Sequence, residues 1–146
     1  MLLNGTDANV KTGGDFSPIP QDKYTLQLLE IKSVQQFNKF KGENQDMLNF
    51  MFAVLDEKPL GEDGDQTTRG KYLWKRCSLS YNKKSWLFKV LSAMLGQELS
   101  KEESEKFDLS TLIGGQVSAM VDQTPSKDGG AIYNNILSFG KVTKKL

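Results

Sequence analysis

The chain has 146 residues, of which 38% are hydrophobic and 25% are charged, and its net charge is +1. This length and composition predict one compact domain with a packed core and exclude general disorder. The chain contains no histidine and one cysteine, Cys77, which excludes an internal disulfide, a cysteine-rich zinc site and any nucleophile activated by histidine. No apolar run reaches the ~20 residues that span a bilayer. These exclusions favour a binding protein over an enzyme, with no cofactor, no metal and no membrane contact.

Charge is distributed unevenly along the chain. The stretch from Arg69 to Gln97 carries seven lysine and arginine residues and no acidic residue, whereas acidic side chains gather at 56–65 before it and at 98–108 after it. A chain that is nearly neutral overall can therefore present one strongly positive surface, which suits a partner that carries phosphates.

The first part of the chain predicts an arm followed by two strands. Residues 1–17 are rich in small polar side chains, which is typical of a flexible arm. The segment 23–36 alternates apolar and polar residues and changes phase near its middle, which predicts a long strand with a bulge. Residues 38–46 are polar and contain Gly42, as a hairpin loop would, and 48–54 alternates again as a second strand.

The rest of the chain predicts a third strand, one clear helix and two further strands. These elements lie at 71–79, 84–95, 117–121 and 132–139, with an acidic loop at 57–70 and a charged, semi-helical segment at 100–113. Gly96 follows the helix where a C-cap glycine belongs. This order matches the OB-fold, a five-stranded Greek-key barrel with one helix between strands 3 and 4. We therefore predict a mainly β OB-fold domain at 18–140 and a short basic tail at 141–146.

The third predicted strand holds the strongest candidates for a binding site. It alternates aromatic and basic side chains at Lys71, Tyr72, Trp74, Lys75 and Arg76. Phosphates need cations along their path, and unpaired bases need flat faces on which to stack, so this alternation favours single-stranded nucleic acid. Strand alternation places Lys75 on the same side as the inward-facing residues, so it is expected at the rim of the barrel. The alternative is that both rings are ordinary strand aromatics covered by the acidic loop.

The loops that flank this face in an OB-fold supply the remaining candidates. They are Phe37, Lys39, Phe40 and Lys41 between strands 1 and 2, and Lys127 and Tyr133 around the loop between strands 4 and 5. The first group predicts a clamp on a single strand, unless its rings fold back on the barrel. Trp86 is different, because its position on the helix favours packing against the core over stacking on a base.

With these features the chain resembles a known family, the small OB-fold proteins that tailed phages encode in replication and recombination gene clusters. The matching segments are Phe16-Ser17-Pro18-Ile19-Pro20 leading to Lys23-Tyr24, Leu48-Asn49-Phe50-Met51-Phe52, Gly70-Lys71-Tyr72-Leu73-Trp74-Lys75-Arg76, Leu79-Ser80, Trp86 with Leu95-Gly96, Phe107-Asp108-Leu109 with Leu112-Ile113-Gly114, and Tyr133-Asn134-Asn135-Ile136. Such proteins are commonly regarded as phage single-stranded DNA-binding proteins. The resemblance implies a sequence-tolerant DNA-coating role in the cytoplasm of an infected bacterium. The chain departs from many such proteins in ending on a basic tail rather than an acidic one.

We therefore expect a protein that coats single-stranded DNA by stacking and phosphate contacts, without catalysis. Phage replication or recombination proteins are further candidate partners, and the sequence allows a homo-oligomer. A second hypothesis is an OB-fold interaction module that docks on a phage recombinase, helicase or polymerase with little DNA contact. A third hypothesis is a nuclease that uses carboxylates to hold a metal. The acidic loop lacks the terminal glutamate of a calcium loop, so its acidic residues are better explained as a solvated surface loop than as metal ligands.

Overall fold

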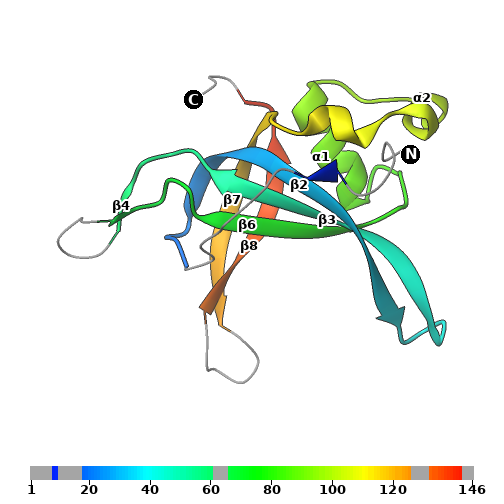
Figure 1. Ribbon diagram of the computed structural model, residues 1–146, viewed down its shortest axis with the longest axis horizontal. Coiled ribbons are helices and arrows are strands. Elements are labelled where there is room, and N and C mark those ends of the chain that lie inside the picture. Colours follow the sequence, from blue (N-terminus) through cyan, green and yellow to red (C-terminus); the bar gives the residue numbers. More distant parts are fainter. Residues whose placement is uncertain (1–7, 10–17, 61–65, 126–131, 143–146) are drawn as a thin grey trace.

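The computed structural model describes residues 8–9, 18–60, 66–125 and 132–142 (Figure 1). Its five long strands are β2 (Asp22–Asn38), β3 (Glu43–Val54), β6 (Tyr72–Ser78), β7 (Gln116–Pro125) and β8 (Ile132–Gly140). Three short strands are β1 (Ala8–Asn9), β4 (Pro59–Leu60) and β5 (Gln66–Thr67). The helices are α1 (Trp86–Leu95), α2 (Lys101–Lys106) and the 3₁₀ turn η1 (Leu109–Leu112). The predicted mainly β class and the predicted order of long elements are confirmed.

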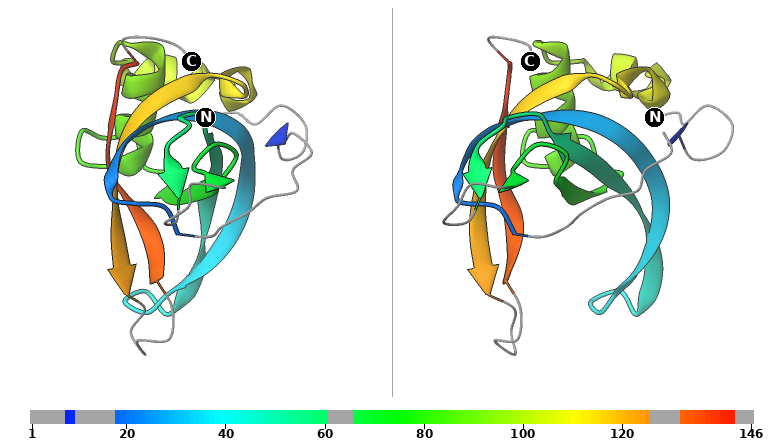
Figure 2. Two further views of the ribbon diagram at one scale, coloured as in Figure 1. Left: turned by 90° about the vertical axis from the view of Figure 1, so that its left-hand side faces the viewer. Right: turned by 60° about the vertical axis from the view of Figure 1, so that its left-hand side comes forward.

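The long strands form one antiparallel sheet in the order β6-β3-β2-β7-β8. β2 pairs with β7 through residues 22–27 and with β3 from Leu26 to its end, so one strand serves both parts of the sheet. The register between β2 and β3 shifts between Leu28 and Glu30, which confirms the predicted bulge. In Figure 2, β2 arches over the molecule from the β7–β8 side to its hairpin with β3. The sheet is barrel-like, but no ladder joins β6 to β8 among the described residues.

The core lies inside this curved sheet, and α1 covers one end of it (Figure 1). The inward residues of every long strand and the apolar face of α1 contribute to one buried cluster. Ser85 caps α1 by accepting a hydrogen bond from the backbone N–H of Phe88, and Gly96 ends the helix with a left-handed φ of 72°. Cys77 on β6 also faces the core. Burial raises the pKa of its thiol to about 12, so this cysteine packs rather than reacts.

The hairpin between β2 and β3 differs from the prediction. The expected loop at 38–46 is only a short turn, because the ladder continues to the pair formed by Asn38 and Glu43. Strand pairing uses the backbone, so polar side chains beyond the core do not stop it when both faces meet water. Figure 1 shows the paired strands of this hairpin extending beyond the rest of the sheet.

Three smaller features also differ from the sequence-based prediction. The acidic segment contains the short pair β4 and β5 rather than loop alone. Within the predicted arm, β1 pairs with β2 opposite Glu30 and Ile31, on the edge of β2 that β7 has left. Leu79, the last residue of the predicted third strand, lies beyond the end of β6 and is exposed. None of the described helices has the length and apolar character needed to cross a membrane.

Candidate nucleic-acid interface

Trp74 is an exposed aromatic ring on the third long strand of the sheet. It lies in the middle of β6, directly opposite Met51 of β3, and exposes 50% of its surface. Its sequence neighbours Leu73 and Lys75 point the other way, since side chains alternate along a strand. Half of the surface of Trp74 is open, whereas the alternative predicted a covered ring. A flat apolar face of this size can accept an unpaired base.

Arg76 supports the same face two residues further along β6. Its guanidinium carbon lies 5.5 Å from the centroid of the Trp74 ring, within the range of a cation–π contact. Its Nη1 donates a hydrogen bond to Oε1 of Gln36 on β2 at 3.2 Å. These contacts place a positive charge beside the exposed ring and connect β6 to the part of β2 that lies close to the β2–β3 turn.

β8 supplies the opposite side of a groove. Trp74, Lys75 and Arg76 of β6 and residues 133–136 of β8 line a hollow of about 260 Å³. Tyr133, at its rim, exposes 45% of its surface. The structure thus brings four candidates, Trp74, Lys75, Arg76 and Tyr133, to one place from two distant parts of the sequence. We call this hollow the β6/β8 groove.

Polar side chains on β8 hold that side of the groove in position. Oδ1 of Asn134 accepts a hydrogen bond from the Ile19 amide at 2.9 Å, and its Nδ2 donates to the carbonyls of Ile19 and Asp122 at 2.8 and 2.9 Å. Asn135 donates to Oγ1 of Thr124 at 2.7 Å. Sequence reasoning missed these two asparagines as groove residues, because only the fold reveals that their strand lies next to β6.

Lys75 lies at the seam between β6 and β8, near the rim position expected for it. Its Nζ is 3.5 Å from the carbonyl oxygen of Ile136 and 3.8 Å from the centroid of the Trp86 ring. Burial lowers the pKa of its ammonium, and the charge of nearby Lys89 acts in the same direction. Lys75 thus carries its charge where two strands and the start of α1 meet.

Two candidates of the third strand lie deeper than expected. Lys71 exposes only 7% of its surface, so it does not lie on the surface that faces a ligand. Its backbone is held on both sides, because its amide donates to the carbonyl of Thr68 in the turn before β6 and its carbonyl accepts from the amide of Val54 at the end of β3. Tyr72 is half-buried at the beginning of β6 and offers less of its ring than Trp74 does. Lys71 is therefore left out of the interface that follows.

The tip of the β2–β3 hairpin forms a second exposed cluster. Phe40 is fully exposed and Phe37 exposes 58% of its surface, so these rings do not fold back on the barrel. Lys39 and Lys41 are exposed beside them. Asn38 holds the turn, since its Oδ1 accepts hydrogen bonds from the amides of Phe40 and Lys41 at 2.9 and 3.2 Å. We call these residues the hairpin tip, and a hollow of about 310 Å³ lies among them.

Two further residues singled out from the sequence, Lys127 and Trp86, belong to neither the groove nor the hairpin tip as defined above. Lys127 lies outside the described residues. Trp86 packs against the core, as its helical position indicated, but it keeps part of its surface exposed. Within the described segments, no group of three or more acidic or cysteine side chains is arranged to hold a metal ion.

Comparisons with known proteins do not assign the chain to a family. No family model, no curated protein and no solved structure matches the chain. The residues of the site itself therefore carry the evidence for function.

Proposed function

We propose that this protein binds single-stranded DNA without strong sequence preference, by stacking bases on exposed rings and placing phosphates beside lysine and arginine. The observation that carries the proposal is Trp74, half exposed on the sheet with the Arg76 guanidinium 5.5 Å from its ring. A stacking face beside a fixed cation suits a nucleotide, which consists of a flat base and an anionic phosphate.

The sheet topology supports an OB-fold as the frame of this interface. The strand order β6-β3-β2-β7-β8 corresponds to the long strands 3-2-1-4-5, with α1 between the third and fourth. In OB-folds the strand 2–3 face and the loops 1–2 and 4–5 bind oligonucleotides. Here those positions correspond to β3 and β6, the hairpin tip, and the segment that ends at Tyr133. We therefore assign the Greek-key barrel as part of the proposal.

The geometry favours a single strand over a duplex. Trp74 and the tip rings offer flat faces, and a base can use them only when it is unstacked from its neighbours. In a duplex the bases are already stacked, and proteins read them by hydrogen bonds at the groove edges. Stacking faces of this kind tolerate every base, because every base has a π face. The setting, replication or recombination of a phage genome in its host, rests on the family resemblance alone.

The experiment is a titration with oligo-dT followed by tryptophan fluorescence at several salt concentrations. The variant Trp86→Phe leaves Trp74 as the single tryptophan and keeps a ring in the packing position of Trp86. We expect its fluorescence to change on binding, and log K to fall linearly with log[salt], with a slope near −0.7 per phosphate neutralised.

The rival interaction module predicts a different result. A barrel that docks on another protein without touching DNA would show neither the fluorescence change nor a salt-dependent affinity for oligo-dT. Such an outcome with a folded protein would refute the proposed function. A labelled strand that becomes shorter only with Mg²⁺ present would instead favour the nuclease hypothesis.

A further inference from the structure

Two lysines converge on one tryptophan at the end of the β6/β8 seam. The Nζ of Lys75 lies 3.8 Å from the centroid of the Trp86 ring, and the Nζ of Lys89 lies 4.6 Å from the same centroid. Neither ammonium forms a salt bridge with any described acidic residue. Two like charges near one ring repel each other, so an anion between them would lower the electrostatic energy of both.

This lysine pair lies between two hollows. Lys75 lines the β6/β8 groove, and Lys89 lines a larger pocket of about 440 Å³ between α1 and the end of β8. Trp86 joins them, since its ring meets that of Phe139 edge-on at a centroid distance of 5.9 Å, and Phe139 lines the larger pocket. Along β8, Ile136 and Phe139 are three residues apart, about 10 Å. The two hollows therefore adjoin along β8.

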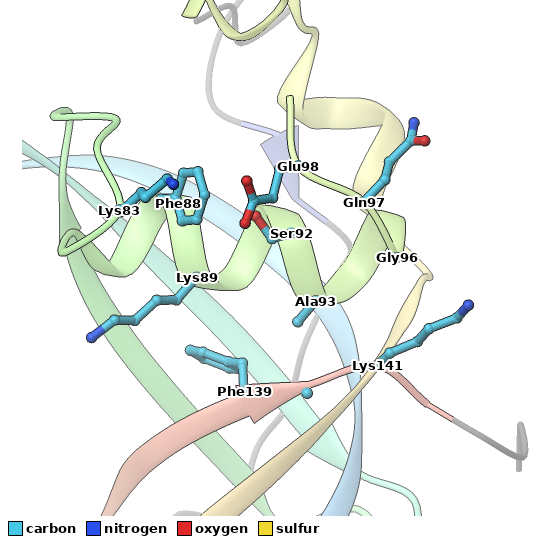
Figure 3. A pocket seen from close by; sticks show the side chains of 11 residues that line it. Lys83, Phe88, Lys89, Ser92, Ala93, Gly96, Gln97, Glu98, Phe139 and Lys141 are labelled. Carbon is cyan, nitrogen blue, oxygen red and sulfur yellow. The ribbon is translucent and has the colours of Figure 1, made fainter. Parts of the chain in front are cut away.

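The side of the larger pocket that adjoins Trp86 has the same chemistry as the groove. All five side chains line the same pocket, and in Figure 3 Lys89 and Phe139 lie below α1, whereas Phe88, Ser92 and Glu98 lie towards its upper edge. The Lys89 side combines a cation with an aromatic ring, and the carboxylate of Glu98 lies away from it. A phosphate chain that leaves the groove therefore meets a positive path along this side of the helix.

We propose that the bound DNA strand continues beyond the β6/β8 groove, across Trp86, and along α1 into the α1/β8 pocket, with one phosphate held between Lys75 and Lys89. This inference rests on the proposed function and extends it to a surface outside the strand and loop positions used above. Continuity with the groove favours the DNA strand as occupant over an acidic peptide from a partner. Burial and the charge of Lys89 both lower the pKa of Lys75, and an adjacent phosphate would oppose both effects.

The test compares Lys89→Gln with Lys101→Gln, a matched control because Lys101 is also an exposed lysine on a helix, α2. Both variants are titrated with oligo-dT of increasing length, from about 4 to about 16 nucleotides, which covers the site sizes of OB-folds. With the longest oligonucleotides, Lys89→Gln should bind several-fold more weakly, and its salt slope should fall by about 0.7. With the shortest ones, which fill only the groove, it should bind like wild type. Lys101→Gln should match wild type at every length.

A second readout follows the ring itself. In the variant Trp74→Phe, Trp86 is the single tryptophan, and its fluorescence should respond to long oligonucleotides but not to the shortest ones. If wild type binds but Lys89→Gln matches it at every length and Trp86 stays silent, the path along α1 is wrong while the proposed function stands. If Lys89→Gln binds DNA normally but loses affinity for an acidic peptide, the pocket serves a protein partner and the path is again wrong. If wild type binds no DNA at all, both proposals are overturned.

Discussion

The β6/β8 groove and the hairpin tip present similar residues in very different ways. In the groove, Trp74 lies on a paired strand, Arg76 lies over its ring, and Asn134 fixes the opposite wall by three hydrogen bonds. At the tip, Phe40 is fully exposed, with no aromatic or cationic partner in the part of the chain that the structure describes. The turn backbone is ordered by Asn38, but the rings themselves are not supported.

This difference implies different contributions to binding. A ring that is already fixed loses little conformational entropy when a base stacks on it, whereas a free ring must first be ordered at a cost of about 0.5–1.5 kcal/mol. The groove should therefore supply most of the affinity. The tip should act as an adaptable clamp whose lysines attract the strand more than its rings hold it.

The largest expected effect comes from removing the fixed ring. Trp74→Ala should weaken oligo-dT binding by about 1–3 kcal/mol, roughly 5- to 150-fold, because a base loses its stacking face. The measurement is a fluorescence-polarisation titration with labelled oligo-dT. Met120→Ala, an exposed apolar residue on β7, is the control and should bind like wild type. Equal affinity for Trp74→Ala and wild type, with circular dichroism showing both folded, would contradict the groove as the main site.

A smaller effect is expected at the tip. Phe40→Ala should cost about 1 kcal/mol or less, roughly fivefold in affinity, since ordering the free ring offsets part of its stacking energy. Polarisation titrations done beside those of Trp74→Ala give the ratio directly. A loss for Phe40→Ala that equals or exceeds the loss for Trp74→Ala would reverse the proposed division between groove and tip.

The tip lysines should contribute mainly to the salt dependence of DNA binding. The double variant Lys39→Gln/Lys41→Gln should reduce the slope of log K against log[salt] by about 1.4, the value for two phosphate contacts, and slow association at low salt. The measurement is the same titration at a series of salt concentrations, with Lys101→Gln as control. An unchanged slope would mean that the strand does not reach the tip.

The sequence predicted the elements better than it predicted which residues meet in space. Hydrophobic alternation revealed the long strands and even the bulge between Leu28 and Glu30, because the side of the sheet that a residue faces is a local property. Burial of Lys71 followed from a turn that only the fold defines. The position of Lys89 beside Trp86 was equally hidden, since residue spacing on α1 does not reveal how the helix sits on β6 and β8.

The smallest effect on affinity is expected from a change in the turn of the hairpin tip, and this change tests whether the tip and the groove are independent. Gly42 has a φ of 67°, and a Cβ added there meets nothing within 4 Å. Gly42→Ala therefore introduces backbone strain alone, roughly 1–2 kcal/mol, at a turn that lies outside the core. Fraying of this turn should lower affinity by no more than Phe40→Ala does. In the Trp86→Phe background, the amplitude of the Trp74 response should stay unchanged, because β6 and β8 form the groove without the turn. A reduced amplitude would show instead that the contact between Arg76 and Gln36 couples the two regions into one unit.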